Sequence, residues 1–505
     1  MWLLAVALLP FAILAGWHWN WGAPGGYGDH AQYLAHARAL VEGRSYTDIG
    51  YIYHPAAPMI GPRAYPPGLP LTLVPIVALA GVNSPWNQVL MLVSLLLFAL
   101  FAYRRLELMV APWQAALAAG LTAIAIEGRF GTLVPMSDVG FGALLWAAIL
   151  AIDTTATWTW KRIAIITSLG FGAMAYRIPG AVLIPALALY AIATWRQHRG
   201  RALIPVAIWG ITGAVVLASG LFDLPFRGQL LPHLPEIGNR IRSLVRVYQP
   251  AVFDAELYPF VSGRLNDAYH AIASVAALGG SAALLWRYRR TMLTATVVMY
   301  TAMLFAAPVN DGRYLWPLYP VIACGMVIGV VLACRIAARL FLRRDVRAAL
   351  PAALALSLVF IGSVWHESKT PRPRSLDHLP DAASLFEWLR ARQVHAPMRV
   401  MFYNPRVLTL KTRVPAMGAI VRPPPFLLSA IYENQITHIV WQSAEARSCR
   451  SALVNALPAL YPDRFAVEYG NETFRVYRVL RSDMPLPDNK GRPIGIPKEC
   501  GGLGT

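Results

Sequence analysis

Long apolar stretches recur along this chain, and they constrain its fold more than any other feature. Segments such as "MLVSLLLFALFAY" (91–103) and "VIACGMVIGVVLAC" (321–334) are apolar around the whole helix, so neither has a polar face for water. A bilayer needs about 17–25 such residues for each spanning helix. Only 14% of the 505 residues are charged, against about 25% in an average globular chain. The sequence therefore predicts an all-α polytopic membrane protein over residues 1–365.

Basic residues between these stretches orient them. The stretches lie at 2–19, 66–82, 86–103, 111–126, 138–157, 162–176, 178–195, 203–222, 268–286, 291–308, 314–334 and 348–365. The basic clusters, which we expect in the cytoplasm, are Arg104/Arg105, Lys161/Arg162, Arg196/Arg199/Arg201, Arg287/Arg289/Arg290 and the arginines of 335–347. All five clusters lie on the same side of the membrane only if the proline-rich stretch 66–82 does not cross the bilayer completely and is instead re-entrant or juxtamembrane. This interpretation gives about eleven spans, whereas a twelve-span alternative leaves Arg104/Arg105 outside.

The N-terminal stretch and the distribution of charge both fit this topology. Residues 1–19 lack a basic start and a small-residue cleavage site, so they are interpreted as an uncleaved first span with a cytoplasmic N-terminus. The net charge of +19 lies mostly in short loops, which argues against a nucleic-acid partner.

The last part of the chain, 366–505, follows a different pattern. A helix is predicted at 381–393 and strands at 398–403, 437–442 and 474–480, which indicates a small external α/β domain followed by an extended tail. Cys449 and Cys500 could form a disulfide there or remain two free thiols, and no C-x-x-C metal or redox spacing occurs.

The topology collects the unexplained polar residues on the external face. External loops are expected at 20–85 and 223–267, and the second contains "EIGNRIRSLVRVY", either a lipid-binding interfacial helix or a plain surface helix. Arg63, Arg177 and Arg313 lie on this face against the positive-inside trend. Convergent guanidinium groups near a membrane suit a phosphate. The alternatives are snorkelling, or pairing with Asp138 or Asp311.

Asp29 is the main candidate for catalysis. The pattern from His30 to Glu42 predicts a helix that ends at Gly43, which makes Asp29 its N-cap. Capping alone would explain this residue, but the same helix end would also keep the carboxylate ionised for work as a general base. Tyr27 and Tyr33 could flank a sugar ring there or serve as interfacial aromatics.

A metal site is not predicted near Asp29. His30, His36 and His54 surround it in sequence, but their spacing matches no H-x-x-x-H or H-E-x-x-H motif. We therefore expect no cofactor, and a divalent metal is the minor alternative.

Several short motifs occur in an informative order. They are "GDHAQYLAHARALVEGRSY", "RAYPPGLPL", "MSD" opening a stretch, "YRIPG" ending one, and "GRYLWPLYP" opening a late one. The set resembles the GT-C-fold, lipid-linked-sugar-dependent glycosyltransferases, in the group of the bacterial aminoarabinose transferases and protein O-mannosyltransferases. The resemblance covers about 1–365, and the external C-terminal domain also fits bacterial members.

The resemblance implies a multi-pass enzyme of the bacterial inner (plasma) membrane that uses a polyprenyl-phosphate sugar on its periplasmic face. The acceptor would be a glycan, a glycolipid or a protein, and membrane lipids would be further partners. Asp29 matches the acidic residue of the first external loop, which would act as a base or orient the acceptor, and Asp138 matches the acidic residue of the second loop as a further catalytic candidate. Arg177 and Arg313 match basic positions for the donor phosphate. Tyr33, His30 and Tyr65 are expected to contact substrate. Family members often have a second acid directly after the first, where this chain has His30.

The expected reaction is a single inverting displacement in which Arg63 also helps to hold the donor phosphate. Other classes remain open, namely a non-catalytic scaffold, a polysaccharide ligase of the same architecture, and a transporter. A transporter would keep polar residues near the middle of its spans, often in repeated halves.

Overall fold

The computed structural model describes residues 1–19, 28–54, 61–127, 134–198, 200–219, 264–306, 312–342, 376, 380–420, 424–443 and 449–480. The chain divides into two compact units. The first unit contains Met1–Gly22, Pro66–Leu69 and Pro85–Arg372, and the second contains Ala23–Tyr65, Pro70–Ser84 and Pro373–Thr505. Part of the first predicted external loop thus shares a unit with the C-terminal part of the chain.

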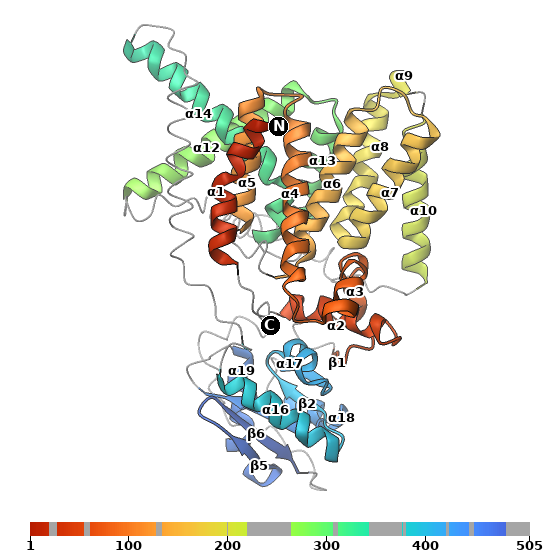
Figure 1. Ribbon diagram of the computed structural model, residues 1–505, viewed down its shortest axis with the longest axis vertical. Coiled ribbons are helices and arrows are strands. Elements are labelled where there is room, and N and C mark those ends of the chain that lie inside the picture. Colours follow the sequence, from red (N-terminus) through yellow and green to blue (C-terminus); the bar gives the residue numbers. More distant parts are fainter. Residues whose placement is uncertain are drawn as a thin grey trace. The chain divides into compact units, whose positions relative to one another are not determined.

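The first unit is helical throughout its described residues. Its helices are α1 (Trp2–His18), α4 (Trp86–Leu106), α5 (Pro112–Glu127), α6 (Ser137–Asp153), α7 (Trp160–Tyr176), η2 (Ile178–Val182), α8 (Leu183–Ala193), α9 (Trp195–His198), α10 (Leu203–Ala218), α12 (Arg264–Arg287), α13 (Met292–Ala306), η4 (Gly312–Leu318) and α14 (Tyr319–Leu342). Pairs such as α4 with α6, α6 with α7 and α1 with α5 pack side by side (Figure 1). Apolar residues from these helices, apart from the short α9, form one continuous core.

One buried ion pair fixes helix ends in this unit. Arg105 donates to Asp153 over 2.6 Å, and the two side chains are 3% and 5% exposed. Asp153 also accepts the backbone N–H groups of Met292 and Leu293 at 2.7 and 3.2 Å. The carboxylate therefore caps the start of α13 and joins the ends of α4, α6 and α13.

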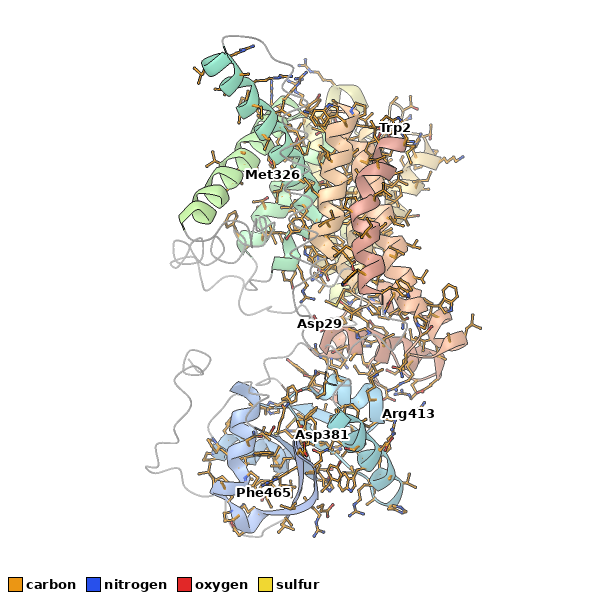
Figure 2. The ribbon with its side chains drawn as sticks, turned by 60° about the vertical axis from the view of Figure 1, so that its left-hand side comes forward. Trp2, Asp29, Met326, Asp381, Arg413 and Phe465 are labelled. Carbon is orange, nitrogen blue, oxygen red and sulfur yellow. The ribbon has the colours of Figure 1, made fainter. Side chains whose placement is uncertain are left out.

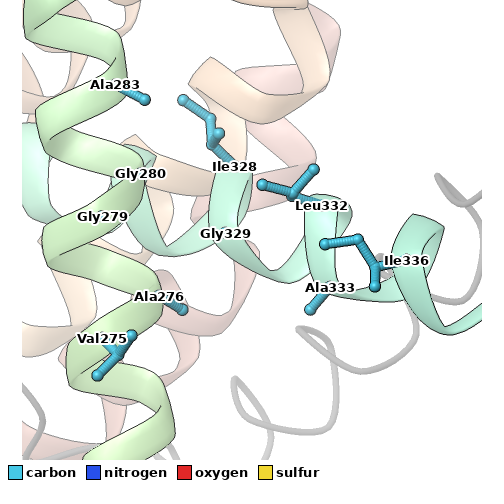
Figure 3. A pocket seen from close by; sticks show the side chains of 10 residues that line it. All are labelled: Val275, Ala276, Gly279, Gly280, Ala283, Ile328, Gly329, Leu332, Ala333 and Ile336. Atoms are coloured by element: carbon cyan, nitrogen blue, oxygen red, sulfur yellow. The ribbon is translucent and has the colours of Figure 1, made fainter.

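Small residues bring α12 and α14 into close contact. A Cβ on Gly280 would lie 2.0 Å from the carbonyl oxygen of Gly325, and one on Gly329 would lie 2.5 Å from that of Ala276. Such close backbone approach is typical of helix pairs in membranes. Beside the crossing lies an apolar groove of about 500 Å³ between the two helices, lined by residues such as Val275, Ile328 and Leu332 (Figure 3).

Two described helices are long and apolar enough to cross a membrane, at Trp86–Leu106 and Gly312–Leu340. Other apolar helices are shorter, among them Gly68–Ala80 and Met292–Ala306. The helical architecture predicted for 1–365 is confirmed for the described residues except Tyr51–Ile52, which form a short strand. The number of spans, and whether 66–82 crosses, stay predictions.

The second unit combines helices with a mixed sheet. Its helices are α2 (Gly28–Val41), η1 (Pro62–Ala64), α3 (Gly68–Ala80, whose first two residues belong to the first unit), α16 (Pro380–His395), α17 (Pro405–Thr412), α18 (Pro424–Glu433), α19 (Cys449–Leu460) and η7 (Pro462–Arg464). Its strands are β1 (Tyr51–Ile52), β2 (Val400–Phe402), β3 (Ala416–Gly418), β4 (His438–Gln442), β5 (Phe465–Gly470) and β6 (Phe474–Val479).

Within the described residues these strands form a sheet of order β1-β3-β2-β4-β6-β5. The pairs β1–β3, β3–β2 and β2–β4 are parallel, whereas β4–β6 and β6–β5 are antiparallel. The predicted small α/β region is confirmed, with β2, β4 and β6 in the predicted segments. The sheet also contains β1, which comes from the first predicted loop: Tyr51 pairs with Ala416.

Several predictions fall outside the described residues. They concern the span at 348–365, the segment "EIGNRIRSLVRVY" (236–248), Tyr27, Asp311 and a bond between Cys449 and Cys500. They stay predictions.

Candidate functional site

Asp29, which is labelled in Figure 2, lies in the first turn of α2. The sequence predicted a helix from His30 with Asp29 as its N-cap, but the helix begins at Gly28, so this detail was wrong. A carboxylate in the first turn is still stabilised by the helix dipole. The other end is as predicted: Gly43 has a φ of +69°, and the amides of Gly43 and Arg44 bond back to Leu40 and Ala39.

Two side chains hold the Asp29 carboxylate. Tyr65 donates its hydroxyl to Oδ1 over 2.6 Å, and Arg406 donates from Nη1 to the same oxygen over 2.7 Å. The Asp29 side chain is 34% exposed, whereas that of Arg406 is 5% exposed. The arrangement therefore leaves the carboxylate partly exposed while the cation that pairs with it is buried.

Arg406 itself is enclosed by aromatic rings. Its guanidinium carbon lies 5.5 Å from the ring centre of Tyr51 and 5.2 Å from that of Tyr65, within cation–π range. Burial raises the pKa of Tyr65 well above 10, and the charge of Asp29 adds to this effect, so the phenol stays protonated and remains a donor. Sequence reasoning found Asp29 and Tyr65 but missed Arg406, which is 377 positions from Asp29 and lies in no recognisable motif.

The pairing of α2 with α17 brings these residues together. At the helix starts, Asp29 meets Arg406. Towards the helix ends, Arg38 donates to the carbonyl oxygens of Leu410 and Thr409 at 2.7 and 3.3 Å. Arg38 thus caps the last turn of α17, where the Thr409 carbonyl also accepts the backbone amide of Arg413 at 2.9 Å. The two helices are therefore held at both ends.

The loop after α2 is packed closely against α17. Gly50 has a φ of +78°, and a Cβ there would lie 2.5 Å from the Thr409 methyl group, so only glycine fits without strain. The carbonyl of Gly50 accepts the amide of Ala416 at 3.0 Å, directly before β1 joins β3.

The other first-loop candidates are buried beside Asp29. Tyr33 packs edge to face on Tyr65, with ring centres 5.3 Å apart, and is 7% exposed. His30 is 1% exposed. His36 stacks on Tyr46 at 4.2 Å and donates from Nδ1 to the Tyr46 carbonyl over 2.6 Å. Burial lowers the His36 pKa to about 4. His30 and Tyr33 stay predictions as substrate contacts.

A second cluster in the first unit contains Asp138, Arg177 and Arg313. Arg177 donates from Nη1 to Oδ1 of Asp138, and its guanidinium lies 4.9 Å from the ring centre of Tyr314. The other oxygen of Asp138 is buried without a hydrogen-bond partner among the described residues. Arg313, next to Tyr314, donates a weak bond to the sulfur of Met136 at 3.9 Å. The structure thus brings together three of the predicted residues from α6, the end of α7 and η4.

Arg63 lies in η1 and is exposed. No group of three or more His, Cys, Asp or Glu side chains among the described residues could hold a metal ion. The expectation about metal use stays a prediction.

Comparison with known proteins shows a match in structure. No protein-family model matches the chain, and no curated protein matches it either. The archaeal oligosaccharyltransferase AglB from Archaeoglobus fulgidus, solved with an inhibitory peptide and a dolichol-phosphate, matches with a TM-score of 0.53 and 14% identity, over 96% of this chain and 75% of that one. The same enzyme solved with Zn and sulfate matches with a TM-score of 0.57 and 13% identity, over 96% and 74%.

A bacterial protein matches over nearly its full length. ArnT from Cupriavidus metallidurans in the apo state has a TM-score of 0.51 and 13% identity, over 94% of this chain and 97% of that one. AglB and ArnT are GT-C-fold, lipid-linked-sugar transferases. The chain therefore has the GT-C fold, and the resemblance predicted from its motifs is confirmed at the level of fold.

Proposed function

We propose that the chain is a membrane glycosyltransferase that moves a sugar from a polyprenyl-phosphate donor to an acceptor hydroxyl, with Asp29 as its base. The observation that carries this proposal is the partly exposed Asp29 carboxylate, held by the buried Arg406 and the Tyr65 hydroxyl. The GT-C fold and the motif order support the donor class. The donor site, the inner membrane and the periplasmic face belong to the proposal.

The chemistry follows from the states of these groups. A general base must be ionised and must reach the proton that it takes. Arg406 favours the ionised carboxylate, and an exposure of 34% leaves room for an acceptor. Asp29 takes the acceptor proton as the acceptor oxygen attacks the anomeric carbon. The bond from that carbon to the phosphate oxygen breaks on the opposite face, which inverts the configuration.

The arginines of the first unit suit the leaving group. A polyprenyl phosphate gains negative charge as it departs, and guanidinium groups stabilise such charge through paired hydrogen bonds. We assign Arg177 and Arg313 to this phosphate. Arg63, which lies in the second unit, stays a prediction as a donor contact. The exposed fraction of Asp138 is only 4%, which supports a role in orienting Arg177. Tyr65 would orient Asp29, and Tyr33 and His30 would line the acceptor side.

The test is transfer from a panel of polyprenyl-phosphate sugars by the full chain in membranes. Asp29→Asn should lower kcat by about 10²–10⁴-fold, because it removes the base while keeping the shape of the side chain. Asp48→Asn is the matched control, since Asp48 lies in the loop after α2, is 59% exposed and forms an ion pair among the described residues only with the partly buried Arg44. It should transfer at the wild-type rate.

The alternative classes give other results. Normal transfer by Asp29→Asn would remove Asp29 as the base. A wild-type chain that transfers from no lipid-linked sugar would favour a scaffold or a polysaccharide ligase. Solute flux across proteoliposomes that contain the chain would favour a transporter.

A further inference from the structure

We propose that Arg406 is a positioning residue for catalysis: it fixes the Asp29 carboxylate and holds it in the charged form. This inference rests on the proposed role of Asp29 as base. It makes the C-terminal part of the chain a contributor to the candidate site, although every motif that points to the function lies in residues 1–365.

The contacts of Arg406 support an electrostatic role. A charged group that is 95% buried is costly unless an opposite charge compensates it. Asp29 supplies that charge at 2.7 Å. The rings of Tyr51 and Tyr65 lie against the guanidinium and restrict its orientation. The side chain therefore has little freedom, and the carboxylate bound to it is restricted as well.

The backbone around Arg406 is also fixed. Strand β2 ends at Phe402, and Pro405 opens α17, where its restricted φ suits the first turn. Arg406 follows directly, near the carboxyl end of a parallel strand, where α/β sheets place their ligand-binding residues. The bonds of Arg38 to Leu410 and Thr409 fix the opposite ends of the same helix pair. The distance from Arg406 to Asp29 is thus set by two docked helices.

The titratable neighbours of Asp29 come from α2, the loop that follows it, β1 and α17. On α2 these are His30, Tyr33 and His36; the loop residues are Tyr46 and Tyr65; β1 contributes Tyr51 and α17 contributes Arg406. Burial raises the pKa values of Tyr46 and Tyr65 and lowers that of His36 to about 4. Burial acts to lower the Arg406 pKa, but Tyr65, Asp29 and Tyr51 raise it overall. Arg406 therefore stays positive throughout the useful pH range.

The experiment compares pH profiles of kcat/KM for the full chain in membranes. In Arg406→Gln we expect kcat/KM at pH 7 to fall at least about tenfold. The acid limb of the profile, where kcat/KM falls as the pH is lowered, should move to higher pH by about one unit or more, because the lost positive charge makes the Asp29 carboxylate easier to protonate. The difference from wild type should shrink as the pH rises. Arg406→Lys keeps the charge but not the planar fork, so its acid limb should stay in place while kcat falls severalfold.

Arg38→Gln is the matched control. It removes a partly buried arginine from the same helix pair, but one that bonds to carbonyl groups and not to Asp29. Its acid limb should coincide with that of wild type. A profile of His30→Gln separates any contribution from the histidine next to Asp29.

The outcomes distinguish this inference from the proposed function. If the Arg406→Gln profile has the shape of the wild-type profile and is lowered by the same factor at every pH, the role of Arg406 is structural and the inference is overturned. Transfer by Arg406→Gln at the wild-type rate would overturn it as well. If Arg406→Gln does not fold, Arg406→Lys decides: a wild-type kcat with an unmoved limb overturns the positioning role. Normal transfer by Asp29→Asn would instead contradict the proposed function.

Discussion

The two units each contain an aspartate bound by an arginine that lies against a tyrosine ring, but the two pairs are arranged in opposite senses. In the second unit the carboxylate of Asp29 is 34% exposed and Arg406 is 5% exposed. In the first unit Asp138 is 4% exposed and Arg177 is 15% exposed. One pair presents its anion and the other presents its cation. The same two residue types thus suit the two proposed roles, a base in one unit and a phosphate ligand in the other.

The largest expected effect in the first unit comes from Arg177→Gln. If the guanidinium binds the donor phosphate, its loss should raise KM for the lipid-linked donor by roughly 10- to 100-fold, since charge-assisted hydrogen bonds contribute about 1.5–3 kcal/mol. Steady-state kinetics with varied donor concentration provide the measurement. A fall in kcat with an unchanged donor KM would break the comparison, because Arg177 would then act on the chemical step.

Asp138→Asn should have a smaller effect of the same kind. The amide still fills the space, but it holds the guanidinium without a charge, so Arg177 loses its fixed orientation. We expect the donor KM to rise by about tenfold or less. Saturating donor should restore kcat, whereas saturating donor should not rescue Asp29→Asn. Equal, unrescued losses in both variants would mean that both carboxylates take part in the chemistry.

The smallest effect concerns the acid sensitivity of the second unit. His36 is buried with a pKa of about 4, below the ordinary value of about 6.5, so the unfolded state takes up a proton at higher pH than the folded state. Its contribution to stability is complete above about pH 6.5 and is lost as the pH falls towards 4. Between pH 7 and pH 5.5 the loss should be about 1 kcal/mol.

Hydrogen exchange of the α2 amides measures this loss of stability. His36→Asn should flatten the pH dependence, since the amide group does not titrate. Helix α6 of the first unit serves as the comparison, because its cluster of Asp138, Arg177 and Tyr314 contains no histidine that would titrate in this pH range. Equal acid sensitivity in α2 and α6 would show that His36 is not its cause.

Sequence patterns could predict the parts of this molecule that depend on local periodicity. Apolar helices, the strands β2, β4 and β6, and the stop of α2 at Gly43 all follow from short windows. The start of α2 was misplaced because an aspartate before a helical pattern is most often a cap. Local patterns also placed Asp29 in a motif, because its neighbours "GDHAQY" are informative.

Long-range pairs could not be predicted from one sequence. Arg406 lies in "YNPRVLTL", which resembles any short amphipathic helix, and nothing there points to residue 29. Strand β1 has two residues, too few for an alternating pattern, and its partner β3 lies more than 360 positions later in the chain. Only the folded structure shows that the first loop and the C-terminal region build one unit.

The pairing of β1 with β3 also bears on how the protein is made. Tyr51 leaves the ribosome long before Ala416, and at about 5–20 residues per second the interval is on the order of tens of seconds. During that time the loop that carries Asp29 has neither its strand partner nor its arginine. A chain truncated before Arg406 never acquires them, so synthesis must pass β3 before this carboxylate is held by both its arginine and its neighbouring strand.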